Sequence, residues 1–366
     1  MKKISSKDLS VVVQGKNIAT HTKNCFDSLR KNFPYAEIIF STYEDENVAD
    51  LDFDILVTSA DPKATLLCEN TYNNINRILT TTKAGLEKVS RKYCLKIRSD
   101  LFFDNDKLLS DIAANFPYRE KKFCVFENRV IFYALWTRKF EYVADKYRIL
   151  TPFYLSDWLC FGLTNDIKLY FNHIPLTDEP HFSKFFKIPQ NNMHNCEGMM
   201  SWQFPPEQYF ASSFFKHYFN DADMKSLQDF SINKMEISRR IFASNVIVCG
   251  YKECGVYNQK EIYKFVSKNI NWLKGIWLSG VYRYADFLYD YKKYCDNNFK
   301  IPLTYLWTLD KTTDDYFIKL SKHYRIFIAP LRVAFRWFEQ IFSICYYGLK
   351  IVFNITKTYF NSLIKK

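Results

Sequence analysis

Short apolar runs alternate with stretches of helical period over the first hundred residues. The runs lie at 10–14, 36–42, 54–58 and 93–98. The apolar residues at helical spacing between these runs are Phe26, Leu29 and Phe33 in a first helix, and Ile75, Leu79, Leu86 and Val89 in a second. Strand-sized runs that alternate with helices are typical of βαβ units, so this part of the chain predicts a mostly parallel sheet flanked by helices.

The rest of the body continues this pattern less regularly. Further strands are predicted at 123–126, 130–136, 159–163 and 245–249. The stretch from 164 to 205 is rich in proline and has little periodicity, and it is interpreted as long loops over one face of the sheet. Residues 259–295 have a helical, aromatic pattern. The first helix is predicted to begin at Thr20 or Thr22, either of which is an N-cap type, and the second to end near residue 91.

The end of the chain has a pattern of its own. From residue 331 onward the polar positions recur every three, four or seven residues, which predicts one long amphipathic helix over 331–364, about 51 Å long. Nearly the whole remaining circumference is apolar and aromatic.

Composition and charge make the tail more informative. The chain is 48% hydrophobic and 25% charged, which is the composition of a globular protein. Its formal charge is +12, and +8 of that lies in residues 316–366. Because the cations and the rings of the tail lie on opposite faces, we expect it to bind an anionic membrane surface. A packed or oligomer-interface helix is the main alternative. Nucleic acid is disfavoured as a partner, because rings and cations are not interleaved in one groove.

Several common classes are disfavoured by what the sequence lacks. No apolar stretch has the length of a signal peptide or of a transmembrane helix, so a cytoplasmic protein is expected. The ten cysteines form no C-x-x-C pair, which indicates reduced and mostly buried thiols. The glycine patterns of dinucleotide dehydrogenases and of P-loop enzymes are also missing.

Polar residues follow two of the predicted parallel strands at the edge where such sheets bind ligands. Gln14 and Gly15 follow the first strand, where a small residue lets the backbone approach a phosphate. Arg98 and Asp100 follow the strand at 93–98. Asp100 is the candidate ligand for Mg²⁺ or Mn²⁺, and Arg98 is placed to neutralise phosphate or to orient a sugar. A structural Arg98–Asp100 pair at a strand end is an equal alternative.

Two further carboxylates lie among aromatic residues. Asp157 is followed by Trp158, and Glu207 stands at the start of a predicted helix after two prolines. Partial burial raises the pKa of a carboxyl group, so either residue is a candidate general base for a hydroxyl acceptor. Helix capping for Asp157 and first-turn charge for Glu207 are the structural alternatives.

Four segments of the chain together resemble the WavE-type lipopolysaccharide synthesis family, a group of glycosyltransferases. They are SVVVQGK, NNINRILTTTKAGLEKVSRKYCLKIRSDL, PFYLSDWLCFGL and PEQYF, and the similarity covers residues 8–257. The most specific part combines Asn76, Arg77, Thr81, Thr82, Gly85 and Leu86 with KIRSDL downstream. The sequence departs from the expected pattern at Lys16 and Ile78.

The resemblance implies a GT-A-like nucleotide-sugar-binding domain over 1–257, in which residues 98–100 occupy the place of the acidic metal motif. A helical extension over 258–315 and the basic amphipathic helix in 316–366 follow it. The residues expected around the nucleotide sugar are Gln14, Gly15, Asn76, Arg77, Thr81, Lys83 and Arg98, with Asp100 on Mn²⁺ or Mg²⁺ and Asp157 or Glu207 as the base.

The expected reaction is sugar transfer from a nucleotide sugar to a lipid-linked oligosaccharide in lipopolysaccharide or surface-glycan biosynthesis, at the inner face of the cytoplasmic membrane. A sugar nucleotidylyltransferase is one alternative, although nine glycines in 366 residues offer little for its glycine-rich loop. A membrane-peripheral scaffold without catalytic activity is the other.

Overall fold

The computed structural model describes residues 3–68, 71–143, 147–177, 204–227, 229–269 and 280–306. The chain through Thr308 forms one compact unit. The predicted helix over 331–364 and most of the predicted loops, at 178–203, lie outside the described residues. None of the described helices has the length and apolar character needed to cross a bilayer.

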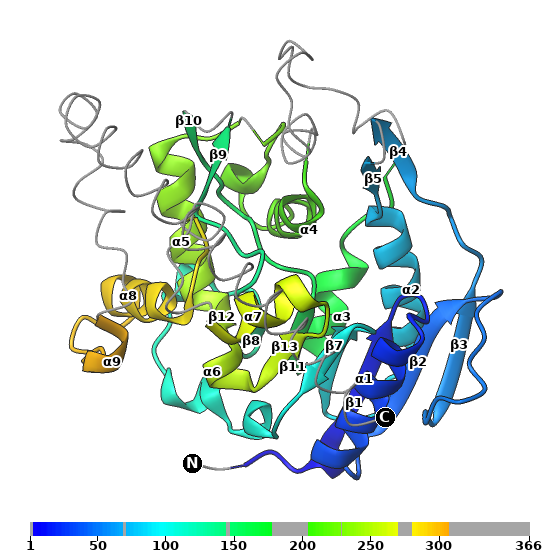
Figure 1. Cartoon of the computed structure of the whole chain (residues 1–366). Helices are drawn as coiled ribbons and strands as arrows, with labels where there is room; N and C mark the ends of the chain where they lie inside the picture. The colour runs from blue at the N-terminus through cyan, green and yellow to red at the C-terminus, as the bar shows by residue number, and fades with distance from the viewer. Residues whose placement is uncertain are drawn as a thin grey trace, which may run out of the picture. The chain divides into compact units, whose positions relative to one another are not determined.

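A seven-stranded sheet forms the centre of the molecule (Figure 1). Its strands, from one edge to the other, are β12 (Val246–Cys249), β8 (Val130–Tyr133), β11 (Leu159–Leu163), β6 (Tyr93–Arg98), β1 (Leu9–Gln14), β2 (Glu37–Tyr43) and β3 (Ile55–Ser59). All neighbouring pairs are parallel except those that β11 makes with β6 and β8. The predicted mostly parallel α/β sheet is therefore confirmed.

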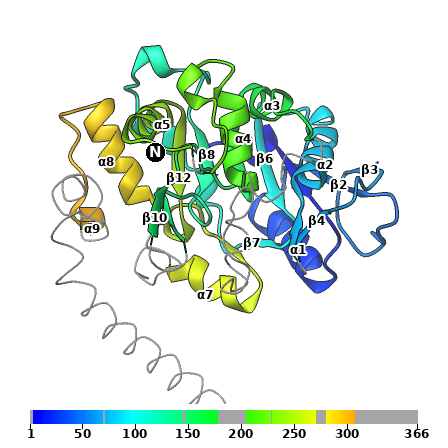
Figure 2. The ribbon, with the colours of Figure 1, turned by 90° about the horizontal axis from the view of Figure 1, so that it is seen from above.

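Helices cover both faces of this sheet, as Figure 2 shows. The described helices are α1 (Thr20–Asn32), α2 (Ile75–Glu87), α3 (Thr164–Asn172), α4 (Pro206–Phe215), α5 (Ile232–Asn245), α6 (Tyr251–Cys254), α7 (Glu261–Asn269), α8 (Tyr284–Tyr294) and α9 (Leu303–Leu306). Among the described residues, three further strand pairs lie outside the central sheet: β4 (Thr65–Cys68) with β5 (Thr71–Asn73), β9 (Phe140–Val143) with β10 (Tyr147–Leu150), and β7 (Leu101–Phe103) with β13 (Val256–Asn258).

Strand alternation decides which side chains face which helix. On one face, α1 packs Phe26 edge-on against Phe40 of β2, with ring centroids 5.3 Å apart. On the other face, α2 lies so close that a Cβ at Gly85 would stand 2.5 Å from Cγ1 of Val12 and 2.9 Å from Cβ of Ser41. Gly85 therefore lets α2 approach the sheet, and Val12 shares its face with Gln14, two residues further along β1.

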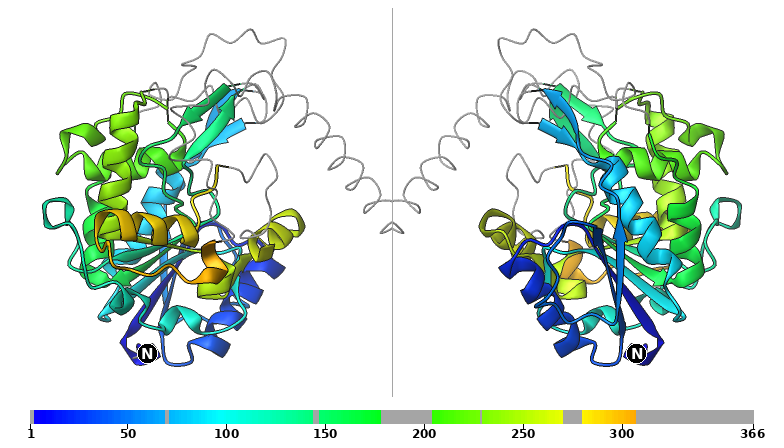
Figure 3. Two further views of the ribbon diagram at one scale, coloured as in Figure 1. Left: turned by 90° about the vertical axis from the view of Figure 1, so that its left-hand side faces the viewer. Right: turned by 90° about the vertical axis from the view of Figure 1, so that its right-hand side faces the viewer.

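The C-terminal helices pack onto this body. The α8 helix contacts α5 and β12, and α7 contacts β13. In Figure 3, α8 faces the viewer in the left view and β3 in the right view, so the two elements lie at opposite edges of the sheet. Position 257 lies inside β13, which pairs with β7 directly after Asp100. The segment after 257 therefore contributes to the same core as the sheet.

Two predicted elements are wrong. Residues 123–126 form no strand, because a 3₁₀ turn covers Lys121–Phe123 and the side-chain oxygen of Asn245 accepts the backbone N–H groups of Val125 and Phe126, at 2.7 and 3.2 Å. The predicted loop from 164 contains α3, which buries Ile167 and Phe171.

Smaller differences concern the helix ends. The N-cap of α1 is Ala19, and Thr20 and Thr22 lie inside the helix, where Oγ1 of Thr22 accepts the N–H of Ile18 at 2.7 Å. The α2 helix ends at Glu87 and not near 91. The cysteines whose side chains are described are unpaired, as predicted: Cys25, Cys94, Cys124, Cys160, Cys249, Cys254 and Cys295.

Candidate functional site

The carboxyl ends of β1, β2 and β6 meet at one edge of the sheet. Gln14 is the register partner of both Arg98 and Ser41, so these three residues lie side by side across the strands. Because β11 runs antiparallel to β6, the residues before it, Asp157 and Trp158, reach the same edge. The sheet topology thus gathers residues from four distant parts of the sequence at one place.

The turn after β1 is fixed by its neighbours. Gly15 has a φ of +117°, which residues other than glycine rarely adopt. Its N–H donates to the carbonyl of Ser41 at 3.1 Å. Ser99 binds the same turn twice. Its N–H donates to the carbonyl of Gln14 at 3.2 Å, and its hydroxyl donates to the carbonyl of Lys16 at 2.7 Å. These two hydrogen bonds from Ser99 join the β1 turn to the segment after β6.

Gln14 presents a buried polar group at this edge. Its residue is 5% exposed, and its side-chain oxygen accepts no hydrogen bond from any described residue. A buried acceptor without a partner is costly in a protein interior, and a bound ligand would satisfy it.

Asp100 is surrounded by cations. Its side chain is fully buried, and its two oxygens accept from Nε and Nη2 of Arg98 at 3.1 and 2.8 Å. Nζ of Lys260 lies 3.4 Å from Oδ2. Burial alone would raise the pKa of Asp100, but the charges of Arg98 and Lys260 and the hydrogen bonds from Arg98 outweigh it and lower that pKa. Asp100 is a permanently ionised carboxylate at neutral pH.

Arg98 is the centre of the site. Its guanidinium carbon lies 4.3 Å from the centroid of a Trp158 ring, a cation–π contact. Burial would lower the pKa of Arg98, but the charges of Asp100, Asp157 and Glu207 raise it. The structure therefore brings both predicted bases, Asp157 and Glu207, into the neighbourhood of Arg98.

The two predicted bases have different surroundings. Asp157 faces the core, where Nζ of the fully buried Lys96 lies 3.8 Å from its Oδ2 and also donates to its backbone carbonyl. Burial lowers the pKa of Lys96. Glu207 lies in the first turn of α4, beside Pro206. Glu207 therefore has the structural role considered for it, a negative charge in the first turn of a helix. Asp157 does not cap a helix, because the strand β11 follows it.

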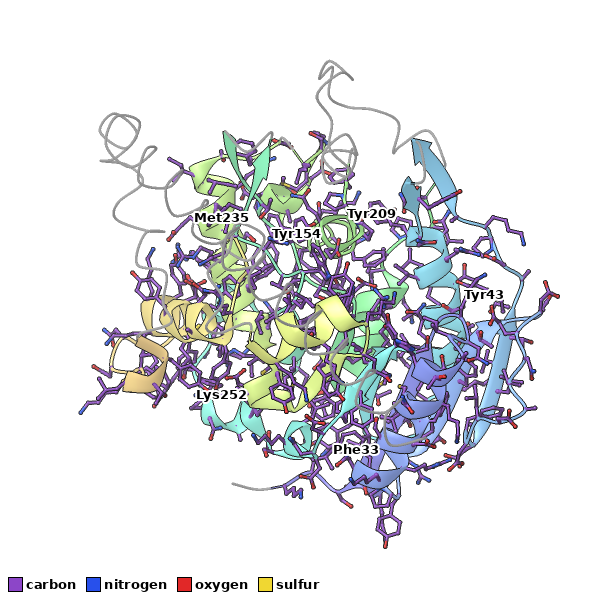
Figure 4. All side chains as sticks on the ribbon, in the orientation of Figure 1. Phe33, Tyr43, Tyr154, Tyr209, Met235 and Lys252 are labelled. Carbon is purple, nitrogen blue, oxygen red and sulfur yellow. The ribbon has the colours of Figure 1, made fainter. Side chains whose placement is uncertain are left out.

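Asn76 and Arg77 lie at the start of α2 and are held by local partners. The side chain of Asn76 exchanges two hydrogen bonds of 2.8 Å with the backbone of Thr177. Arg77 binds Asp61 through Nε at 2.7 Å and through Nη2, and its guanidinium lies 5.5 Å from the ring centroid of Tyr43. Tyr43 is the last residue of β2 and is labelled beside α2 in Figure 4.

Thr81 and Lys83 lie further along α2 and contribute to packing. Thr81 is fully buried, and its hydroxyl donates to the carbonyl of Arg77 at 2.9 Å. Nζ of Lys83 donates to the carbonyl of Ile174 at 2.6 Å, just after α3. The structure does not bring either side chain to Arg98, and their predicted contact with the nucleotide sugar stays a prediction.

The Asp61–Arg77 ion pair should make the stability of the fold depend on pH. Hydrogen bonding from Arg77 lowers the pKa of Asp61 from 3.8 to about 2. The group therefore stabilises the fold above pH 4, and this contribution is lost as the pH falls from about 4 to 2. In thermal melts followed by circular dichroism, Asp61→Asn should lower the Tm at pH 6, and the difference from wild type should shrink towards pH 2. Asp45→Asn, at an exposed residue, is the control, and a difference that stays constant down to pH 2 would contradict this assignment.

The described side chains do not fit a divalent ion on Asp100. Such an ion needs free carboxylate oxygens, but those of Asp100 already face Arg98 and Lys260. Within the part of the chain that the structure describes, no group of three His, Cys, Asp or Glu residues could hold a metal ion. The described residues around Asp100 therefore do not support the expected Mn²⁺ or Mg²⁺.

Three residues of the site are absent from the sequence predictions. Asn258 is the last residue of β13, Lys260 follows it 160 residues after Asp100, and Lys96 lies in the middle of β6. Lys96 carried a local signal, since a lysine inside an apolar strand needs a partner. Lys260 carried none, because its position depends on the pairing of β7 with β13.

The model of the WavE lipopolysaccharide synthesis family matches residues 9–314. The chain belongs to this family. The match extends beyond the predicted limit at 257 and includes β13, α7 and α8, so Lys260 lies inside the family region. No protein of curated function matches this WavE family member.

Two of the solved structures that share a distant likeness with it come from S. aureus and Anaerococcus prevotii. TarS residues 1–349 from S. aureus are 11% identical, with 82% of this chain and 77% of that chain covered and a TM-score of 0.31. The 4-diphosphocytidyl-2C-methyl-D-erythritol synthase from Anaerococcus prevotii DSM 20548 is 12% identical, with 48% and 83% covered and a TM-score of 0.29.

Proposed function

We propose that this WavE family member is a GT-A-like glycosyltransferase in lipopolysaccharide or surface-glycan biosynthesis. It moves a sugar from a nucleotide-sugar donor to a lipid-linked oligosaccharide at the inner face of the cytoplasmic membrane, with residues 331–364 on the anionic lipid surface. The observation that carries the proposal is the strand edge where Gln14, Arg98 and Asp100 meet, in a chain whose family is one of lipopolysaccharide synthesis.

The donor lies across the carboxyl ends of β1 and β6. Gly15 lets the nucleotide approach the backbone, and the buried oxygen of Gln14 accepts a hydrogen bond from the base or the sugar. Arg98 faces the diphosphate. Such an edge of a mostly parallel sheet is where nucleotide ligands bind, because strand ends and helix starts leave polar backbone groups there.

Transfer breaks the bond between the anomeric carbon and the diphosphate oxygen. The acceptor hydroxyl oxygen forms the new bond to that carbon, the nucleoside diphosphate leaves with the electron pair, and the hydroxyl proton passes to a carboxylate if configuration is inverted. We assign this role to Glu207, because Asp157 is already paired with Lys96 inside the core. Asp157 then acts as a positioning residue for Trp158 and Arg98.

A panel of UDP, GDP, CMP and dTDP sugars tests the function. A true donor should raise the Tm of the wild-type protein, and it should yield a product on a lipid-linked oligosaccharide acceptor. Glu207→Gln should keep this donor shift and lose transfer by about 10²- to 10⁴-fold if the reaction inverts configuration.

Glu87→Gln, at the exposed far end of α2, is the control and should behave as wild type. A protein that binds no nucleotide sugar and forms no product would refute the glycosyltransferase assignment. Full transfer by Glu207→Gln would remove only the assigned base.

A further inference from the structure

We propose that Arg98 and Lys260 bind the donor diphosphate directly, in the role that a divalent cation was expected to fill, and that Asp100 holds these two cations together. This inference rests on the proposed glycosyltransferase function. It concerns the chemistry that recognises the leaving group.

The different exposure of the Asp100, Arg98 and Lys260 side chains favours an anionic ligand over a metal ion. The side chain of Asp100 is 0% exposed, whereas those of Arg98 and Lys260 are 29% and 44% exposed. A group that enters the site from solvent therefore meets the two cations before the carboxylate. This arrangement attracts phosphate and repels Mn²⁺ or Mg²⁺.

Both cations keep donors for a ligand. Arg98 uses Nε and Nη2 on Asp100, and Nη1 donates to no residue that the structure describes. The Trp158 ring lies against the guanidinium face and fixes its plane. At 3.4 Å from Asp100, Nζ of Lys260 retains N–H groups for a second acceptor. A fixed guanidinium beside an ammonium is the donor set that binds phosphate oxygens.

The charge around Asp100 is also suited to a diphosphate. Arg98 and Lys260 exceed Asp100 by one positive charge, and Lys96 and Asp157 compensate each other. The exposed Lys16, whose carbonyl accepts from Ser99, adds a further cation at the β1 turn, while Glu207 offsets part of the excess.

Lys260 is held in place by backbone contacts around Asp100. The N–H of Gln259 donates to the carbonyl of Asp100 at 3.1 Å, and its side-chain amide donates to the carbonyl of His21 at 2.7 Å. The N–H of Lys260 donates to the side-chain oxygen of Asn258 at 3.0 Å. The lysine therefore starts from a fixed backbone position and needs little ordering when a ligand binds.

Isothermal titration of the full chain with UDP, GDP, CDP and dTDP tests the inference, each in EDTA and again with Mn²⁺. The nucleotide that binds should do so in EDTA with a Kd within about threefold of that in Mn²⁺. Lys260→Ala should weaken this binding by about 10- to 100-fold, the range expected when one charged hydrogen-bond donor is removed. The corresponding monophosphate should be affected less.

Lys264→Ala is the matched control. This lysine lies in the first turn of α7, which begins just after Lys260, and its Nζ is 5.7 Å from the ring centroid of Tyr257, so its removal should leave Kd unchanged. Circular dichroism of both variants checks that the fold is intact.

The outcomes separate the two proposals. Binding that requires Mn²⁺, or that Lys260→Ala leaves intact, would overturn the inference and leave the glycosyltransferase function standing. If no nucleoside diphosphate and no nucleotide sugar binds under either condition, both proposals are wrong.

Discussion

Replacing Arg98 with alanine is expected to lower the kcat/KM of sugar transfer by about 10²- to 10³-fold. Arg98 binds both oxygens of Asp100, lies against Trp158 and faces the expected position of the leaving diphosphate. Removing one fixed donor that stabilises developing charge usually costs that much in rate. Steady-state kinetics with the donor identified by the nucleotide-sugar panel measure the effect.

Arg98→Lys is the informative companion variant. It keeps one positive charge but loses the two-pronged contact with Asp100, so its rate should lie between those of Arg98→Ala and wild type. Because both variants alter a buried cluster, their unfolding in urea must be compared with wild type. Wild-type kinetics in a folded Arg98→Ala protein would show that the pair is only structural.

Replacing Asp290 with alanine is expected to destabilise the fold by about 3–5 kcal/mol. The side chain of Asp290 is 0% exposed and joins α8 to α5 by accepting from Nε of Arg239 at 3.0 and 3.1 Å. It also accepts from the hydroxyl of Tyr282 at 2.7 Å. Burial, followed by the charge of Asp290, raises the pKa of Tyr282 well above its usual range. Without Asp290, the Arg239 cation is left buried without this partner.

A second ion pair between the same helices supplies the control. Lys293 and Glu236 are 3.3 Å apart, and each side chain is 40% exposed, so Lys293→Ala should cost at most about 1 kcal/mol. Urea unfolding followed by circular dichroism gives both free energies. Equal losses of unfolding free energy in the two variants would show that the buried Arg239–Asp290 pair stabilises the fold no more than the exposed Lys293–Glu236 pair.

Much of the sheet could be predicted from the sequence because its signal is local. The apolar runs at 10–14, 93–98 and 159–163 coincide with β1, β6 and β11, since a buried strand needs consecutive apolar residues. The same rule failed at 123–126. There the side-chain oxygen of Asn245, about 120 residues away, accepts the backbone N–H groups that a neighbouring strand would otherwise bind. It also missed α3, whose apolar spacing lies in a segment interpreted as loops.

The candidate site was predictable only in part for a related reason. Gln14 and Arg98 follow from the rule that ligands bind at strand ends, and the structure places them side by side. What surrounds Asp100 does not follow, because Lys260 reaches it through tertiary pairing. The sequence alone offered a carboxylate and suggested a metal ligand. The structure offers a carboxylate covered by two cations, which favours a different ligand chemistry.

The pairing of β7 with β13 also sets when the site becomes complete. All seven strands of the central sheet have been synthesised once the ribosome passes Cys249, but Asn258 and Lys260 follow only afterwards. A nascent chain at that stage has the strand edge, with Arg98 and Asp100, and lacks the second cation. If Lys260 binds the donor as proposed, the chain gains this contact only after residues 256–260 have been synthesised and β13 has paired with β7.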